Sequence, residues 1–339
     1  MEYFRQLISA SLMHNASHVY FVADKPTAIR VLGRLEFLQT RKNSASDIEA
    51  LLSAVLSSAS DRKAFDSTGS AEVCMEFDPL HTLRIRVIKE LSGIKIVVHI
   101  KKQDFPSEEN LPQKLLQVIS SPKPGMLFLG GAFHHNKDAT LSALLKLIGE
   151  SHKFHVLVFG VEFSDATSHE GSLISYYSIE QANIDLIRFQ APDIVVFKDV
   201  DPEIMKVARE CVMFGTLVMA SVDSISHACT ILRILSLFSD VEVGKRFLCE
   251  SMLGMLFQVL LTKASEPSFY LYDFLEMSDN VRQLIMCDNI RSVGNVQMVQ
   301  QLNSMVEKGI LEYYDIHPVL CNLDHLSSQQ CSSKDTDAF

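Results

Sequence analysis

Hydrophobic positions in the first hundred residues change several times between helical and strand-like spacing. Residues 3–13 place apolar side chains three to four positions apart, which is the spacing of one helix face. The remaining apolar runs are short and bounded by polar or turn residues, as in strands. The predicted elements are helices at 3–13 and 47–57 and strand-like segments at 19–23, 29–38, 73–77, 83–88 and 94–100. This pattern predicts a small N-terminal α+β domain over residues 1–103.

From residue 125 onwards, strand-type and helix-type segments alternate along the chain. Such alternation is typical of a parallel sheet with covering helices. The predicted strands are 126–130, 155–161, 194–197 and 216–220. The predicted helices are 140–148, 247–262, 281–286 and 296–307, together with two helices that begin at Asp201 and at Ser224. We therefore expect an α/β domain over residues 125–326 with a helical C-terminal part. The polar residues 327–339 are expected to form a disordered tail.

The segment 104–124 is predicted to be a linker followed by a helix. Its first residues are acidic and include Pro106, and Ser107 stands where a serine would cap a helix that runs to Val118. A second helix start is predicted at Asp201 and Pro202, because a capping carboxylate and a first-turn proline both favour helix initiation.

Length and composition point to a globular protein with two domains. The chain has 339 residues, of which 47% are apolar and 21% charged, and this balance excludes a disordered protein. No apolar run approaches the roughly 18 residues of a membrane helix. Residues 1–15 lack the pattern of a signal peptide, so we expect a cytoplasmic protein with no transmembrane segment. The net charge of −10 argues against nucleic acid as a partner.

The cysteines give no sign of a structural metal site. There are seven of them, with no C-x-x-C pair, and the number is odd. Both facts disfavour a zinc site or a disulfide framework. We expect buried, reduced thiols.

The stretch FLGGAFHHNKDATL, residues 128–141, has the frame of a phosphate-binding loop between a strand and a helix. A Walker A loop has the spacing G-x-x-x-x-G-K-[ST]: backbone N–H groups close on phosphate, the lysine neutralises it, and the hydroxyl holds magnesium. Gly131 and Lys137 occupy the first glycine and the lysine positions. Asn136 takes the place of the second glycine, and Asp138 replaces the hydroxyl residue.

Lys137 requires an anion, because a cation in the first turn of a helix opposes the helix dipole. The anion is either a nucleotide phosphate or an internal partner, Asp138 or Asp199, and the sequence leaves both alternatives open. Asp138 would repel a phosphate oxygen by about 4 kcal/mol at about 4 Å with an effective dielectric constant of about 20. Magnesium held between Asp138 and Asp199 would offset this repulsion. His134 and His135 are expected to be exposed loop residues rather than metal ligands.

Several segments of the chain resemble, in the same order, the PilT family of pilus retraction ATPases. ASHVYF (16–21) and RIRV (84–87) stand where the family has A-S-D-[LI]-H-[LI] and R-[FY]-R-V. KPGMLFLGG (123–131) and APDIVVFKD (191–199) resemble the entry to its Walker A loop and its Walker B strand. Further similar segments are IRVLG (29–33), GTLVMASVDSISHACTI (215–231), CESMLGMLFQVLLTK (249–263), NVRQLI (280–285) and LNSMVEKGIL (302–311). The resemblance covers nearly the whole chain.

The resemblance implies a PAS-like N-terminal domain followed by a RecA-like P-loop domain. Family members use ATP and magnesium and form hexameric rings at the cytoplasmic base of a pilus or secretion machine. The resemblance thus implies a homo-oligomer or a mixed ring with an intact PilT-type ATPase, beside an inner-membrane platform protein. The implied site has Gly131, Asn136, Lys137 and Asp138 for nucleotide, Asp138 and Asp199 for magnesium, and Asp199 and Glu162 as catalytic carboxylates.

Almost every position that carries chemistry in the family is changed here. The substitutions are Asp199 for the Walker B glutamate, Lys198 for the glycine before it, Asp223 for the His box histidine, Leu253 and His99 for two arginines, and a single acid, Glu162, in the region of the Asp box. These changes favour a catalytically impaired structural or regulatory ring subunit. Two alternatives stay open: an active retraction or secretion ATPase that uses Asp199 and Asp138, and a sensor that binds nucleotide without turnover.

Overall fold

The structure, a computed structural model, describes residues 2–14, 16–31, 34–78, 81–102, 106, 108–132, 135–151, 153–161, 171–261 and 269–324. The chain divides into two compact units. The N-terminal unit comprises residues 1–104 and 262–267, and the C-terminal unit comprises residues 105–261 and 268–339. Within the described ranges, every helix is too short or too polar to cross a membrane.

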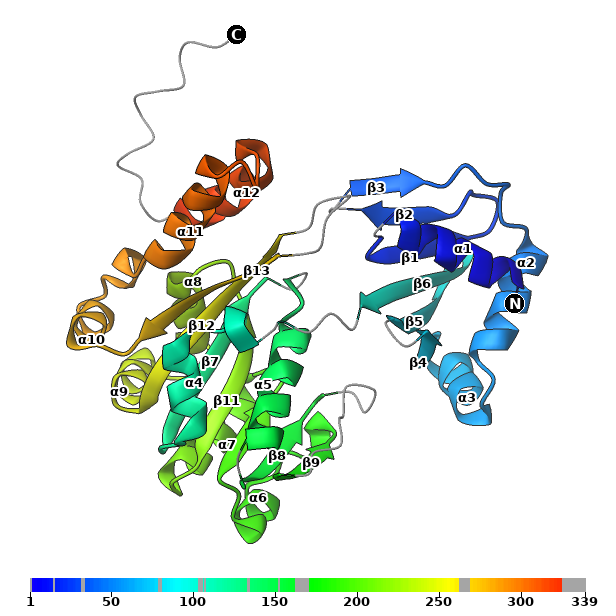
Figure 1. Cartoon of the computed structure of the whole chain (residues 1–339). Helices are drawn as coiled ribbons and strands as arrows, with labels where there is room; N and C mark the ends of the chain where they lie inside the picture. The colour runs from blue at the N-terminus through cyan, green and yellow to red at the C-terminus, as the bar shows by residue number, and fades with distance from the viewer. Residues whose placement is uncertain are drawn as a thin grey trace. The chain divides into compact units, whose positions relative to one another are not determined.

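The N-terminal unit is a six-stranded antiparallel sheet with three helices (Figure 1). The strand order is β3-β2-β1-β6-β5-β4. The elements are α1 (Glu2–Met13), β1 (His18–Val22), β2 (Ala28–Val31), β3 (Arg34–Phe37), α2 (Ala45–Val55), α3 (Ala59–Thr68), β4 (Ser70–Asp78), β5 (His81–Glu90) and β6 (Gly93–Lys102). The predicted run 29–38 is in fact two strands, β2 and β3, which pair with each other. The hydrophobic pattern does not predict α3, because Phe65 is the one buried residue of that helix.

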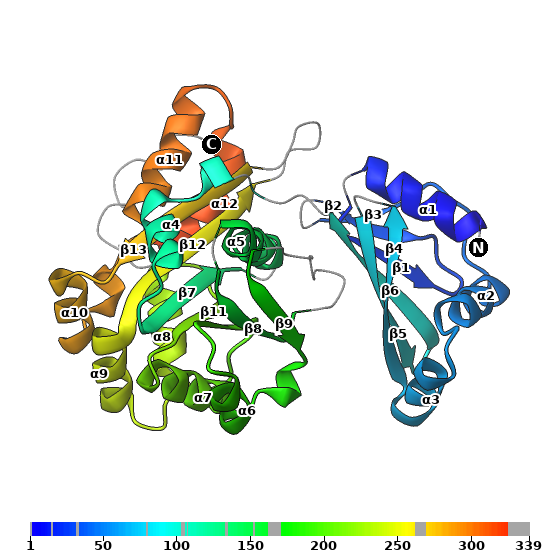
Figure 2. The same ribbon diagram turned by 60° about the horizontal axis from the view of Figure 1, so that its bottom comes forward.

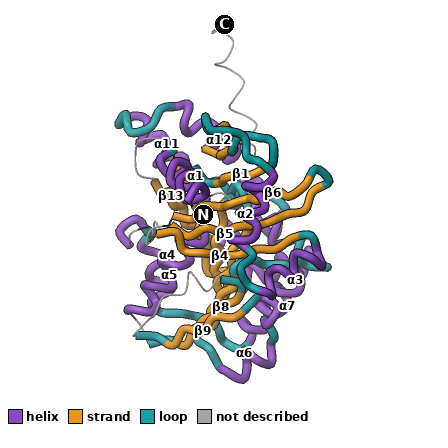
Figure 3. Tube along the Cα trace, turned by 90° about the vertical axis from the view of Figure 1, so that its right-hand side faces the viewer, coloured by secondary structure: helices purple, strands orange, loops and turns teal. Residues whose placement is uncertain are grey.

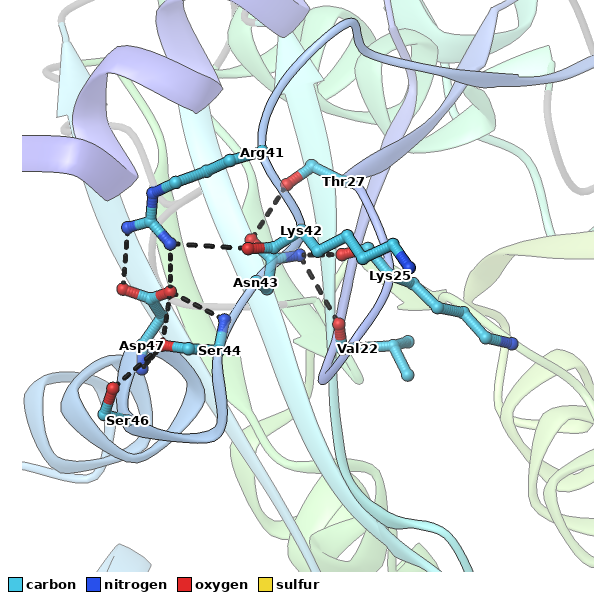
Figure 4. Close-up of polar contacts among 9 residues, drawn as sticks. All are labelled: Val22, Lys25, Thr27, Arg41, Lys42, Asn43, Ser44, Ser46 and Asp47. Carbon is cyan, nitrogen blue, oxygen red and sulfur yellow. Dashed lines mark hydrogen bonds and ion pairs between the residues drawn. The ribbon is translucent and has the colours of Figure 1, made fainter.

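A hydrogen-bonded network fixes the start of α2 (Figure 4). Ser44 is the N-cap: its hydroxyl accepts from the Asp47 backbone N–H, and the Asp47 carboxylate accepts from the Ser44 N–H at 2.7 Å. Arg41 donates two further bonds to that carboxylate, at 2.6 and 2.9 Å. The Arg41 guanidinium and then the Ser44 bonds hold the pKa of Asp47 well below its usual range. Asn43, 1% exposed, donates to the Lys25 carbonyl at 3.0 Å and so ties this start to the turn after β1.

The C-terminal unit is built on a seven-stranded sheet in the order β13-β12-β7-β11-β10-β8-β9. Its strands are β7 (Gly125–Gly131), β8 (His155–Phe159), β9 (Leu173–Tyr177), β10 (Ile194–Phe197), β11 (Leu217–Asp223), β12 (Met252–Leu261) and β13 (Phe269–Glu276). All neighbouring strands are parallel except β12 and β13. This arrangement of a small α+β unit and an α/β unit confirms the predicted fold class.

Helices cover both faces of this sheet. They are α4 (Gln113–Ser120), α5 (Lys137–Ser151), α6 (Ile184–Gln190), α7 (Pro202–Met213), α8 (His227–Leu235), α9 (Val241–Ser251), α10 (Asp279–Met286), α11 (Val296–Glu307) and α12 (Tyr313–Asp324). One apolar layer joins α4 and α5 to the strands, and another joins α6 to α10 to the opposite face, so that α5 and α7 lie on opposite sides in Figure 2. Every residue of β7 and β10 is buried, as expected for parallel strands covered on both faces.

The last two helices, α11 and α12, lie side by side in Figures 1 and 3. They pack against β12 and β13 through a separate apolar cluster that includes Phe257, Met298, Leu302 and Ile316. The predicted helix 296–307 coincides with α11. The sequence pattern does not predict α12, β9 or β13.

The predicted helix 247–262 is wrong. The chain forms α9 up to Ser251 and continues directly into the strand β12, which lies between β7 and β13. Eight of the ten β12 residues are buried, and a continuous apolar run of this kind cannot be assigned to helix or strand by its periodicity.

Predictions of helix starts have mixed outcomes. The helix expected to begin near Ser107 begins at Gln113, with Pro112 at the N-cap, and Ser107 itself lies outside the described residues. The prediction at Asp201 is confirmed, because its carboxylate accepts from the Ile204 N–H at 2.8 Å at the start of α7. The helix expected from Ser224 starts three residues later, after the N-cap Ser226.

The expectation of buried thiols is wrong for three cysteines. Cys74, Cys287 and Cys321 are exposed, whereas Cys211 is buried. All the cysteines that the structure describes are free. The predicted disordered tail, 327–339, lies outside the described residues.

Candidate phosphate-binding site

Strand order decides which side chains meet at the loop after β7. Strand β11 lies between β7 and β10, and Asp223 at its end is directly paired with Gly131 at the end of β7. Asp199 follows β10, one strand farther from the loop. The carboxyl ends of parallel strands share one edge, where ligands bind in open α/β sheets. Of the two carboxylates at these strand ends, Asp223 is therefore the one on the strand next to β7.

Lys137 is the first residue of α5 and is already paired. Its Nζ donates to the Gly131 carbonyl at 3.0 Å and forms an ion pair with Asp223 Oδ1. The lysine side chain is 8% exposed and that of Asp223 is 42% exposed. The pair thus holds a buried ammonium against a half-exposed carboxylate, and this carboxylate is the anion that the first turn of α5 requires.

A side chain at Gly131 would be crowded in this arrangement. A Cβ at this position would lie 3.0 Å from the Gln258 carbonyl oxygen and 3.4 Å from Lys137 Cγ. The Gly131 carbonyl also accepts from the Ser224 N–H at 3.0 Å. The first glycine of the motif is therefore kept for close packing beside the lysine.

Three successive residues before and at the start of α5 are each tied to a different strand. The His135 ring Nδ1 donates to the Gln258 carbonyl of β12 at 3.2 Å, and Gln258 Nε2 donates back to the His135 carbonyl. Asn136 Nδ2 donates to the Tyr270 hydroxyl of β13 at 3.0 Å. Lys137 pairs with Asp223 of β11. We refer to His135, Asn136 and Lys137 as the tied segment.

Asn136 adopts a backbone conformation that usually favours glycine. Its φ is +54°, in the left-handed region. Asparagine tolerates this region better than other residues with a Cβ, because its short amide can bond locally. The loop thus keeps its turn without the second glycine.

Asp138 forms the second ion pair of the site. Its Oδ2 lies 2.9 Å from Nζ of Lys198, the residue that follows β10. The side chains of Lys198 and Asp138 are 14% and 30% exposed. The Asp138 carboxylate at the start of α5 is therefore matched by a lysine just after the end of β10.

Asp199 shares the electrostatic environment of these two pairs. Burial raises the pKa of Asp199, and the carboxylates of Asp223 and Asp138 raise it further, while Lys198 and Lys137 lower it. The site therefore brings two ammonium groups together with three carboxylates. Among the described residues, no three His, Cys, Asp or Glu side chains are placed to hold one metal ion.

The structure brings together Gly131, Asn136, Lys137, Asp138 and Asp199, as the sequence pattern expected. The internal partner expected for Lys137 was Asp138 or Asp199, and this is wrong because the partner is Asp223. Sequence reasoning also missed the roles of Lys198, Gln258 and Tyr270. The signal for Lys198 was present, since an unexpected cation directly followed a predicted strand.

Four other residues singled out from the sequence are not among the side chains described at this site. Glu162 and His134 fall outside the described residues. Leu253 lies on β12, next to Gly125, rather than on a helix. In the N-terminal unit, His99 stacks on His18 with ring centroids 4.5 Å apart.

No family model matches the chain, and no curated protein matches it. Solved structures do. The crystal structure of the pilus retraction motor PilT with bound ADP has a TM-score of 0.73 and 20% identity, over 93% of this chain and 96% of that chain. The X-ray structure of the Legionella pneumophila ATPase DotB has a TM-score of 0.74 and 18% identity, over 94% of this chain and 95% of that chain. The X-ray structure of the Yersinia pseudotuberculosis ATPase DotB has a TM-score of 0.75 and 18% identity, over 94% of this chain and 93% of that chain. This chain therefore has the fold of PilT and DotB, an N-terminal domain followed by a RecA-like domain.

Proposed function

We propose that this chain is a PilT-like motor-ring subunit of a type IV pilus or type II/IV secretion system, with a phosphate site neutralised from within. Its role is structural or regulatory rather than ATP-hydrolysing. The ion pair of Lys137 and Asp223 carries the proposal, because the lysine that would meet phosphate already has an anion. The fold shared with PilT and DotB supports the assignment to a motor ring.

The residues present do not fit a magnesium nucleotide as they are arranged. The Asp138 carboxylate stands where the motif has a metal-binding hydroxyl, and it is engaged by Lys198. A phosphate entering beside Lys137 would have to displace Asp223 and then face the charge of Asp138. Each of these two costs is several kcal/mol at an effective dielectric constant of about 20.

A second candidate, a nucleotide sensor or an active ATPase, is supported by one observation. Burial raises the pKa of Asp199, and the nearby carboxylates of Asp223 and Asp138 add to that effect. A divalent cation with oxygen ligands would relieve such a crowding of carboxylates. In this reading Asp199 is the catalytic carboxylate, and Asp138 and Asp199 hold magnesium, with Glu162 as a further acid.

Nucleotide titration separates the two candidates. The wild type is expected to show no binding of a fluorescent ATP analogue with magnesium at micromolar concentrations. Asp223→Ser frees Lys137, so binding should appear, and Lys137→Ala in the same background should abolish it. Asp279→Ser is the matched control, because Asp279 is a fully exposed acid in an ion pair away from the site.

Hydrolysis supplies the second readout. We expect no turnover above background in the wild type, since the metal-binding hydroxyl and the catalytic glutamate of the motif are both replaced. Steady turnover of about 1 per second or faster, lost in Lys137→Ala, would reject the impaired-subunit proposal in favour of the active ATPase. Micromolar binding without turnover would favour the sensor.

Assembly is proposed to be independent of the nucleotide. We propose a ring of copies of this chain, or a mixed ring with an intact PilT-type ATPase, at the cytoplasmic face of an inner-membrane platform protein. The internally neutralised site supports this, because the loop needs no ligand charge to hold its shape. Light scattering without nucleotide should show an oligomer, alone or with an intact homologue. Monomers under both conditions would contradict it.

A further inference from the structure

A second buried polar cluster lies away from the loop, where α8, β13 and α11 meet. It consists of His227, Asp273 and Asn295, which are 0%, 4% and 4% exposed. His227 is the first residue of α8, Asp273 lies on β13, and Asn295 is the N-cap of α11. We call these three residues the α11 cluster.

Two hydrogen bonds connect the α11 cluster to helix starts. The Asp273 carboxylate accepts from the Met298 N–H in the first turn of α11 at 3.1 Å. The Asn295 side-chain oxygen accepts from the His227 N–H at the start of α8 at 3.0 Å. An anion at a helix N-terminus is stabilised by the helix dipole, so Asp273 is placed as the ionised anchor of α11.

The imidazole of His227 is the part of the α11 cluster whose hydrogen bonding is incomplete. Among the residues that the structure describes, both ring nitrogens lack a hydrogen-bond partner, as does Asn295 Nδ2. Nε2 faces Asp273 Oδ1 at 3.6 Å, just beyond hydrogen-bond distance but within reach of an ion pair. A buried polar group without a hydrogen-bond partner is rare and destabilises the fold. Its presence needs a physical reason, such as a charge on the group or a conformational change.

Among the residues that the structure describes, Asp273 is the carboxylate within 4 Å of the His227 ring. From β12, Phe257 contacts the ring edge-on at 5.7 Å. The 3-10 turn η5 (Ile290–Ser292) also packs on α8, and its charged residue, Arg291, is exposed. The start of α11 adds an amide, Asn295, and no charge in its first turn.

We propose that His227 and Asp273 form a proton-dependent clamp that holds α11, and with it α12, against the α/β body. When His227 takes up a proton, the cation faces the Asp273 carboxylate, and the pair pulls the start of α8 and the start of α11 together. When the ring is neutral, the carboxylate keeps the Met298 bond but loses its counter-charge. The C-terminal helices are therefore held more tightly when the ring carries a proton than when it is neutral.

The clamp is independent of nucleotide and adds regulation to the ring subunit. The segment 223–226 runs from Asp223, the partner of Lys137, to the N-cap of α8 that precedes His227. Apolar contacts join α11 and α12 to β12 and β13, and Gln301 Nε2 donates to the Tyr272 carbonyl at 3.1 Å; the cluster adds a second polar contact between α11 and β13.

Hydrogen exchange on the full-length protein tests the clamp. Amide protection of α11 and α12 is measured at pH 8 and pH 6, corrected for intrinsic exchange, and divided by that of α5. We expect this ratio to rise roughly tenfold at the lower pH in the wild type. His227→Gln keeps a buried hydrogen-bonding side chain without the charge and should make the ratio independent of pH. His317→Gln, an exposed histidine on α12, is the matched control and should leave the wild-type response intact.

The wild-type measurement decides the proposal even if His227→Gln does not fold. A ratio that stays constant or falls between pH 8 and pH 6 would overturn it. Asp273→Asn is the second variant, since the amide oxygen still accepts from the Met298 N–H but offers no charge. A wild-type pH response that persists in Asp273→Asn would show that another group carries the proton, and would likewise overturn the clamp.

Discussion

The pair of Lys137 and Asp223 predicts a measurable coupling energy between the two residues. Replacing Asp223 with Ala leaves the ammonium of Lys137, with 8% of its side chain exposed, without a counter-charge. Two opposite charges about 3 Å apart attract by about 5 kcal/mol at an effective dielectric constant of about 20. The half-exposed Asp223 lets water screen the pair, so we expect a net coupling of about 2 kcal/mol.

A double-mutant cycle isolates this coupling. Asp223→Ala should destabilise the C-terminal unit by about 2–3 kcal/mol, and Lys137→Met by about 1 kcal/mol, because methionine fills the space without a buried charge. The double variant should be less destabilised than the sum of the two by about 2 kcal/mol. The chain has no tryptophan, so urea unfolding is followed by far-ultraviolet circular dichroism, with hydrogen exchange of α5 and β11 to localise the effect.

A coupling below about 0.5 kcal/mol would refute the reasoning, because the two substitutions would then act as independent sites. The control cycle uses Lys206 and Glu203, an exposed pair on α7 at 2.7 Å. Such surface pairs contribute little, so that cycle should give a coupling close to zero.

Three further predictions concern single residues. Because burial raises the pKa of Asp199, the folded protein binds the Asp199 proton more tightly than the unfolded chain, and the folding stability falls as the pH rises above the ordinary pKa of 3.8. In thermal melts, Asp199→Asn should raise the Tm at pH 7 and make the Tm depend less on pH. Burial, aided by Arg30, lowers the pKa of His18, so stability is lost as pH falls below 6.5, and His18→Gln should remove that loss in melts between pH 5 and pH 8. Asn136→Ala should cost about 1–2 kcal/mol in urea unfolding because its φ is +54°, and Asn136→Gly should cost less; equal costs would contradict the role of the left-handed backbone.

Local signals in the sequence predicted the parts of the fold that depend on near neighbours. The start of α7 follows from Asp201 and Pro202, and the alternation after residue 125 indicates the parallel sheet. The strand β12 could not be predicted, since its apolar run is buried on both faces and has no periodicity to read. The helix α3 could not be predicted either, because Phe65 is its one buried residue and a single apolar position gives no helical spacing.

The sequence predicted which residues lie around the loop but not how they pair. The motif placed Gly131, Lys137 and Asp138 correctly around a loop between strand and helix. The choice of Asp223 over Asp199 as partner depends on β11 lying between β7 and β10, and β11 comes after β10 in the chain. Sequence order does not give this spatial order, so the partner of Lys137 had to come from the structure.

The tied segment is stiff as well as neutral. His135, Asn136 and Lys137 are consecutive, yet each is bonded to a different strand, β12, β13 and β11. The backbone cannot move one of them far without straining its neighbours, so opening requires the links to all three strands to break together. Such an event is rare and slow compared with the motion of a segment held at one point. A substitution that removes the link to only one strand should therefore leave the segment in place, whereas removing two links should change its exchange kinetics abruptly.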